Sequence, residues 1–175
     1  MKKILISTML FLTSITFSQT VKNLTAFYTD KRPNTANEFI PPIYYKDINN
    51  NFNPFLGTWI SQIGANTFVV TLWKETKLPA KDRNDEILYY RDEIFGHYKL
   101  VQNYGLANET IIYTSQINYL NSPTEIPTAI YATSTIYNKL GATVYDIKTM
   151  TNQKYWGVRG SLAMIISDTL PNIST

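Results

Sequence analysis

The residues best suited to acid–base chemistry gather around His97, the only histidine of the chain. Asp92 and Glu93 lie a few residues before it, and a hydrolase could draw on these three groups. Adjacent residues of a strand point to opposite faces, however, so the two acids are not placed as a catalytic pair across a cleft. No Gly-x-Ser-x-Gly elbow supplies a nucleophile for the histidine. We therefore expect His97 to be an exposed residue paired across a sheet, and the two acids to be surface residues.

A calcium-loop spacing is present but incomplete. Asp82, Asn84, Glu86 and Glu93 occupy the first, third, fifth and twelfth places of such a loop. Ile87 stands where the loop needs glycine for its sharp turn, and no helical pattern flanks the segment. One histidine without any cysteine also cannot build a zinc site of the usual kind. The sequence predicts a solvated charged loop, with no metal site and no cofactor.

The N-terminus has the layout of a secretory signal peptide. Met1-Lys2-Lys3 is basic, residues 4–17 are largely apolar, and Thr16-Phe17-Ser18 offers small residues where a signal peptidase reads. The apolar run is shorter than the roughly 20 residues of a membrane anchor. We expect cleavage after Ser18, with Gln19 beginning the mature chain. Because the chain has no cysteine, it has no lipobox, so we expect a periplasmic or extracellular protein that is not a lipoprotein.

The mature chain is nearly neutral in charge. Without Lys2 and Lys3, 14 basic side chains face 13 acidic ones, and no basic stripe of the kind that binds nucleic acids is visible. No stretch after the signal peptide is long enough to span a bilayer as a helix. Removal of residues 1–18 from the 175-residue chain leaves 157, which suits a single domain.

Residues 19–53 show the least pattern. Pro41-Pro42 blocks both helix and central strand, and Asn49-Asn50-Asn51 is typical of a loop. We expect an extended N-terminal arm there, followed by a β domain over residues 54–170.

The β domain is predicted from short apolar runs separated by Gly, Asn and Pro turns. No stretch of ten or more residues has a convincing helical period. We expect a bend at residues 93–96 and a loop around Leu78-Pro79. An antiparallel meander of this size would expose an apolar face and two edges, so we expect it to close into a β-barrel, with a β-sandwich as the alternative. The predicted strands are residues 57–63, 67–74, 87–91, 97–102, 109–117, 128–137, 142–149, 153–159 and 161–168.

The strand over residues 67–74 carries apolar side chains on both faces. We expect Phe68, Val70 and Leu72 to point inward and to line the barrel, although the face of Val69 and Trp73 is also apolar. The tryptophans Trp59, Trp73 and Trp156 fit core packing, and they fit equally the lining of a cavity for an amphipathic ligand.

The segment Phe55-Leu56-Gly57-Thr58-Trp59 resembles the opening of lipocalin-like and fatty-acid-binding barrels. The resemblance implies that Gly57 lets the chain swing into the barrel bottom and that Trp59 plugs that end. It also implies that a late arginine, here Arg159, lies over the Trp59 ring as a cation–π partner.

A second resemblance covers the chain from about Phe55 to the last strand. The signal ending in Phe17-Ser18-Gln19, the Gly57-Thr58-Trp59 strand and the run Asp92-Glu93-Ile94-Phe95-Gly96-His97-Tyr98 are similar to those of a family of small exported Bacteroidota proteins of unknown function. The resemblance implies a fold, a compartment and a structural role for Gly96, but no activity.

Three functions are compatible with these observations. The first is an exported, non-catalytic binding protein that holds a small apolar or amphipathic ligand. The second is a protein–protein interaction or inhibitor module with a filled core. The third is a hydrolase that uses Asp92, Glu93 or His97. A cavity would favour the first, an exposed apolar patch the second, and carboxylates converging on His97 the third.

Overall fold

The computed structural model describes residues 19–30, 41–117, 128–136, 138–149 and 157–167. The expected signal peptide, Trp156 and most of the strand expected over residues 153–159 lie outside these ranges. The elements in chain order are β1 (Val21–Asn23), η1 (Leu24–Tyr28), β2 (Ile43–Lys46), η2 (Asn53–Phe55), β3 (Gly57–Ile63), β4 (Asn66–Lys81), β5 (Ile87–Gln102), β6 (Thr110–Thr114), β7 (Ile130–Ala132), β8 (Thr135–Ile136), β9 (Lys139–Tyr145), η3 (Ile147–Thr149) and β10 (Arg159–Ile165).

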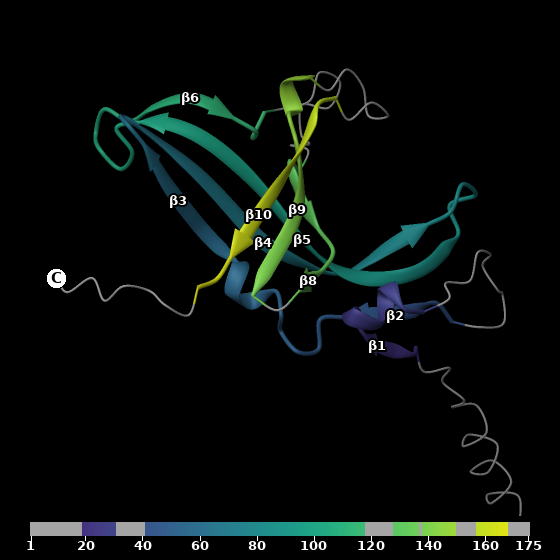
Figure 1. Cartoon of the computed structure of the whole chain (residues 1–175). Coiled ribbons are helices and arrows are strands. Elements are labelled where there is room, and N and C mark those ends of the chain that lie inside the picture. Colours follow the sequence, from purple (N-terminus) through teal and green to yellow (C-terminus); the bar gives the residue numbers. More distant parts are fainter. Residues whose placement is uncertain (1–18, 31–40, 118–127, 137, 150–156, 168–175) are drawn as a thin grey trace, which may run out of the picture.

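The described strands form one sheet that curls into a half barrel (Figure 1). β5 is its spine: it pairs with β4 on one side and with β2, β7 and β6 in succession on the other. From β7 the sheet continues through β9 to β10. The all-β prediction is confirmed. Among the described strands β3 pairs only with β4 and β10 only with β9, so no pairing there closes a barrel.

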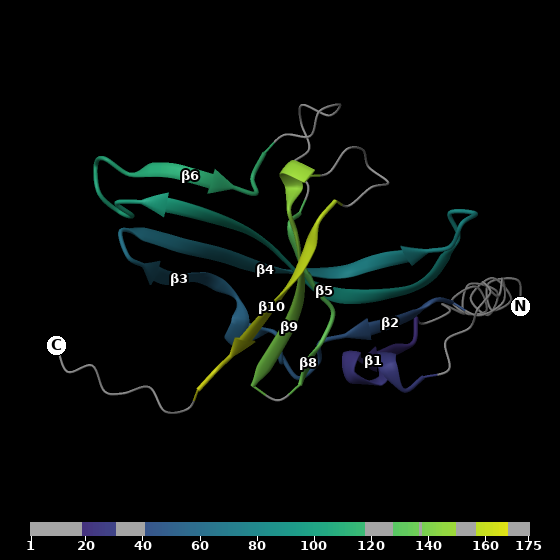
Figure 2. The same cartoon turned by 45° about the horizontal axis from the view of Figure 1, so that its top comes forward.

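The sheet branches, which a simple meander does not. In Figure 2, the ends of β4 and β5 that carry β3 and β6 extend to one side, and β9 and β10 cross near the middle. On the other side, β1 pairs with β2 and β2 pairs with β5, in both cases in parallel. The described pairings among residues 57–165 are antiparallel, as predicted, but the branching and the two parallel pairings of β2 depart from a simple meander. The pairing of β2 with β5 joins segments over 40 residues apart, and local turn signals cannot reveal it.

Within the described residues, helical structure is confined to the short turns η1, η2 and η3. None of these has the length and apolar character that crossing a bilayer would require.

β5 runs without interruption over 16 residues, so the bend predicted at residues 93–96 is wrong. Gly96 sits in its middle for a different reason. A Cβ built on it would lie 2.5 Å from Leu72 Cδ2 and 2.7 Å from the Thr71 carbonyl oxygen. Glycine is therefore needed because β4 and β7 pack too closely to admit a side chain.

β4 is also longer than predicted, because Leu78-Pro79 belongs to the strand rather than to a loop. β3 covers β4 only as far as Leu72, so among the described strands the outer edge of β4 is unpaired beyond that residue. A proline is tolerated on such an edge, since no ladder donor is lost. A bulge lies between Glu75 and Leu78, where Lys77 has φ 56°, and it changes the direction of the strand.

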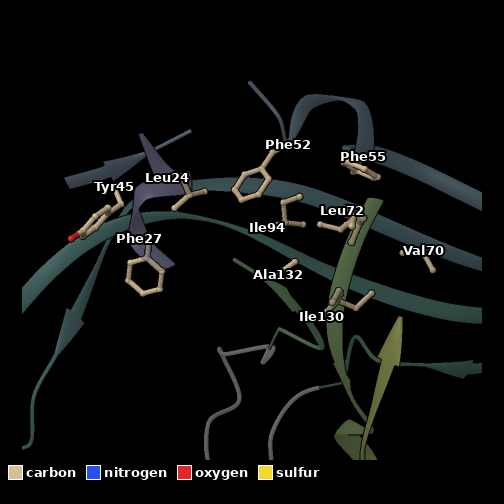
Figure 3. Packing of buried hydrophobic residues seen from close by; sticks show 12 residues of the cluster. Leu24, Phe27, Tyr45, Phe52, Phe55, Val70, Leu72, Ile94, Ile130 and Ala132 are labelled. Atoms are coloured by element: carbon tan, nitrogen blue, oxygen red, sulfur yellow. The ribbon is translucent and has the colours of Figure 1, made fainter. Parts of the chain in front are cut away.

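The core packs against β4 and β5 and includes side chains of the N-terminal segment (Figure 3). Leu72, Ile94 and Ile130 come from β4, β5 and β7 and belong to one buried cluster. Val70 is buried in the same cluster and Phe68 packs against it, so the predicted inward face of β4 does face the core. The described part of residues 19–53 also contributes Leu24, Phe27, Tyr45 and Phe52 to this cluster.

The described part of the predicted N-terminal arm is ordered against the sheet. β1 and β2 belong to the same sheet as residues 57–165, and the aromatic rings of this segment bury themselves against β5. Phe27, for example, contacts the rings of Tyr45 and Tyr89 edge-on, with centroids 5.2 Å and 5.1 Å away.

The close approach at Gly96 yields a stability prediction. Gly96→Ala should lower the free energy of unfolding by about 1–3 kcal/mol, because the added methyl overpacks the β4–β5–β7 contact. Gly141→Ala in β9 is the matched control, since a methyl group added there would meet no other atom within 4 Å. Urea unfolding of the two variants measures the difference. Equal stabilities would contradict this account of Gly96.

Candidate functional site

A cavity of about 370 Å³ lies between the N-terminal segment and the β7–β8 connection. Phe68, Val70 and Leu72, the predicted lining, are not among the residues that bound it. They belong instead to the wall of packed side chains described above. The lining residues are Leu24, Thr25, Tyr28, Asp47, Asn51, Phe52, Ser134 and Thr135.

One side of the cavity is formed by η1. Asn23 caps this turn, because its side-chain oxygen accepts a hydrogen bond from the Thr25 N–H at 3.1 Å. The cap turns Leu24 into the core, while Tyr28 stays more than half exposed at the rim. The Tyr28 hydroxyl is hydrogen-bonded to Thr133 Oγ1 at 2.6 Å, so η1 is tied directly to the β7–β8 connection.

The turn that follows β2 contributes Asp47, Asn51 and Phe52 to the lining. Asp47 Oδ1 accepts from the Asn51 N–H at 2.8 Å, and Oδ2 accepts from the Phe52 N–H at 3.2 Å. Lys74 Nζ lies 3.3 Å from the same Oδ2 and balances the buried charge. The turn places the Phe52 ring in the core beside the cavity (Figure 3).

A second buried carboxylate holds this turn in place. Asp92 is 0 % exposed, and it accepts the Tyr44 hydroxyl at 2.6 Å, the Asp47 N–H at 2.9 Å and the Lys77 N–H at 3.1 Å. Asp92 is therefore not a surface acid as predicted. Burial, and then the hydrogen bond to Asp92, raise the pKa of Tyr44, so the phenol remains a donor.

Three polar side chains on the cavity have no hydrogen-bond partner among the described residues: Asn51, Ser134 and Thr135. By contrast, the hydroxyls of Thr25 and Tyr28 are engaged with Asn23 and Thr133. An apolar interior with a few unpaired polar groups around it is the usual composition of a small-molecule site.

Sequence reasoning missed all of these cavity residues. The sequence around Asp47 does indicate a turn. An aspartate followed by an Asn-rich run is typical of a turn whose backbone N–H groups bond to the aspartate carboxylate. No comparable signal marks Ser134 or Thr135, which meet the turn only through the tertiary fold.

His97 is half-buried rather than exposed, and it lies next to a serine. Its Nδ1 is 3.3 Å from Ser115 Oγ, and its ring packs on Trp73 with centroids 5.3 Å apart. Ser115 is fully buried, and its Oγ accepts the Tyr98 N–H at 2.9 Å. Burial lowers the pKa of His97. As the residues lie, Ser115 is closed to a substrate, so the contact serves packing between β5 and the chain after β6.

The calcium-loop residues do not gather. The Asp82 carboxylate accepts the N–H groups of Asn84 and Glu86 at 2.8 Å and 2.9 Å, which closes the turn between β4 and β5. Glu93 lies well inside β5 and is paired with Arg91. In the part of the chain that the structure describes, no group of three or more acidic, histidine or cysteine residues is placed to hold a metal ion.

The residues of the lipocalin resemblance lie as follows. Gly57, with φ 106°, turns the chain from η2 into β3. Trp59 is 37 % exposed on β3, and its indole N–H donates to the Phe55 carbonyl oxygen at 2.9 Å. Arg159 is exposed and lies opposite Tyr145 at the β9–β10 pair. None of the cation–π contacts between described residues joins Arg159 to Trp59.

Comparison with known proteins gives one match. The model of a family described as "Family of unknown function (DUF6705)" matches residues 1–158. No curated protein and no solved structure matches the chain. The expectation that the protein falls in a family without an assigned function is confirmed.

The buried acid yields a second prediction. Asp92→Asn should cost about 2–3 kcal/mol of unfolding free energy, because an amide group cannot accept all three donors that now converge there. Asp85→Asn, in the exposed turn between β4 and β5, is the control and should change stability by less than about 0.5 kcal/mol. Chemical denaturation measures both. A harmless Asp92→Asn substitution would refute the importance of this network.

The burial of His97 should make the stability of the protein depend on pH. Because the folded-state pKa of His97 lies below its unfolded value of about 6.5, folding favours the neutral ring. Its contribution to stability is complete above that unfolded value and is lost as pH falls through the folded pKa. His97→Gln should therefore lose less stability than the native protein between about pH 7.5 and pH 5. Acid groups such as Asp30 and Glu109 contribute equally to both proteins, so identical pH profiles would contradict the prediction.

Proposed function

The chain belongs to the Family of unknown function (DUF6705), whose description names no activity, and we propose its function from the geometry of the cavity. The protein is an exported, non-catalytic binding protein that holds a small apolar or amphipathic molecule between η1, the turn after β2 and the β7–β8 connection. One observation carries this proposal: a cavity with an apolar interior is bordered by three polar side chains without partners in the described structure.

The dimensions of the cavity support this proposal. Its volume of about 370 Å³ falls within the range of small-molecule sites, roughly 300–1,000 Å³. A ligand that covers the exposed Tyr28 ring would remove apolar surface from water, which is worth about 25 cal/mol for each Å². In this proposal the half barrel is lipocalin-like, but the ligand lies against the N-terminal segment rather than among Phe68, Val70 and Leu72.

Export is part of the same proposal. The basic start, the apolar run and the small residues before Gln19 support a cleaved signal peptide, and the absence of cysteine argues against lipid attachment. The working compartment would then be the periplasm or the outside of the cell.

A second candidate function is supported by strand β3. All seven of its residues are exposed, Ile60 and Ile63 each to 63 %, and it pairs with β4 alone among the described strands. An uncharged edge strand of this kind can add a strand from another protein. A protein–protein interaction module would use this edge and would not depend on the cavity.

The fourth prediction separates the two candidates. Ser134→Trp should fill the cavity and weaken binding of a neutral solvatochromic dye such as Nile red by about tenfold or more, which corresponds to about 1.4 kcal/mol. Ser61→Trp is the matched control on exposed β3, and it should leave the dye affinity within about twofold. Fluorescence titration of the folded variants gives both values.

A further variant guards against misfolding. Thr25→Trp fills the same cavity from an exposed position and should have the same effect as Ser134→Trp. Native mass spectrometry of the protein from its own host should show a mass above that of residues 19–175 that disappears on denaturation. A bare mass, together with dye binding that ignores both filling variants, would remove the binding-protein proposal and leave the interaction module.

A further inference from the structure

We infer that the ligand is an uncharged molecule with a flat apolar body and a hydroxyl-like head group that can both donate and accept a hydrogen bond. The inference rests on the proposed function, because it names the chemical class that the same cavity would take. It follows from the charges, the apolar surfaces and the unpaired polar groups that border the cavity.

The charges argue against an ionic ligand. No described lining residue is Lys, Arg or His, so an anionic head group would find no counter-charge there. The one charged lining residue is Asp47, and an anion would be repelled by it. A cationic ligand gains little from Asp47, because its carboxylate already receives the N–H groups of Asn51 and Phe52 and the ammonium of Lys74. The Asp47 side chain is also only 1 % exposed.

The apolar surfaces favour a flat body. The accessible aromatic surface of the cavity is the ring of Tyr28, which is 55 % exposed, whereas Phe52 is 0 % exposed and backs the lining. An accessible aromatic ring at a small cavity suits offset or edge contacts with a planar ring system. The Tyr28 ring is held in place by the bond between its hydroxyl and Thr133, so this rim is already ordered without a ligand.

The unpaired polar groups specify the head group. Ser134 and Thr135 carry hydroxyls and Asn51 carries an amide, and each of these groups both donates and accepts. A ligand without a polar group would cut them off from water and leave them unpaired, which weakens binding. A neutral hydroxyl meets them without the large desolvation penalty that a charged head group would suffer.

A matched series of ligands tests the inference on the native protein. Naphthalene, naphthalenemethanol, naphthoate and naphthylmethylammonium share one ring system and differ in the head group. Calorimetric or fluorescence titration near neutral pH should show that naphthalenemethanol binds about tenfold tighter than either ion and several-fold tighter than naphthalene.

Removing one hydroxyl sharpens the test. Thr135→Val keeps the shape of the side chain and should weaken naphthalenemethanol toward the affinity of naphthalene, whose own binding stays unchanged. Thr110→Val on exposed β6 is the control and should change neither affinity. Ser134→Ala offers a second, smaller deletion on the same cavity should Thr135→Val fold poorly.

The outcomes distinguish this inference from the proposal on which it rests. If Ser134→Trp weakens the binding of Nile red but the four ligands bind equally, the proposed function stands and the head-group inference fails. Tightest binding of naphthoate or of naphthylmethylammonium would also overturn the inference, since either would reveal a charged partner for the ligand. If neither Nile red nor any of the four ligands binds, the proposed function fails as well.

Discussion

The carboxylate of Asp92, buried in the middle of β5, is the contact on which the rest of the described structure depends. A buried charge is tolerated only when its hydrogen bonds are satisfied, and Asp92 receives donors from β2, from the turn after β2 and from the bulge of β4. One side chain therefore joins the N-terminal segment to both long strands. This tie anchors residues 43–52 to the sheet.

The hydrogen bonds of Asp92 also help to position one part of the cavity wall. Asp92 holds the N–H of Asp47, and the carboxylate of Asp47 in turn holds the N–H groups of Asn51 and Phe52. Through these hydrogen bonds, the two acids connect β5 to the turn that lines the cavity. A cavity wall that is already ordered loses little conformational entropy when a ligand binds. These hydrogen bonds are therefore consistent with a preformed binding site.

The fold also leaves two surfaces with different uses. The cavity at η1 is small, and Asp47 is the one charged residue among the described residues that line it, as suits a small neutral molecule. The edge strand β3 is open and uncharged, as suits another strand. They are formed by different elements, and no residue of β3 lines the cavity, so substitutions can address each surface without touching the other. His97 and Ser115 belong to neither surface, since their contact is enclosed by Trp73 and the backbone of Tyr98.

The sequence by itself determined the all-β class and the bounds of β3, because both depend on local alternation and turn residues. It did not settle the inward face of β4, since both faces are apolar and Val69 is buried along with Val70 and Leu72. It did not reveal the parallel pairing of β2, the need for glycine at position 96 or the burial of Asp92. Those features arise where segments far apart in the chain meet, and a residue type alone does not say what it will meet. The candidate site belongs to this second group, since Asn51 and Thr135 share one cavity only after the sheet has curled. Tertiary structure decided the site because unpaired polar groups can be recognised only once every neighbour is in place.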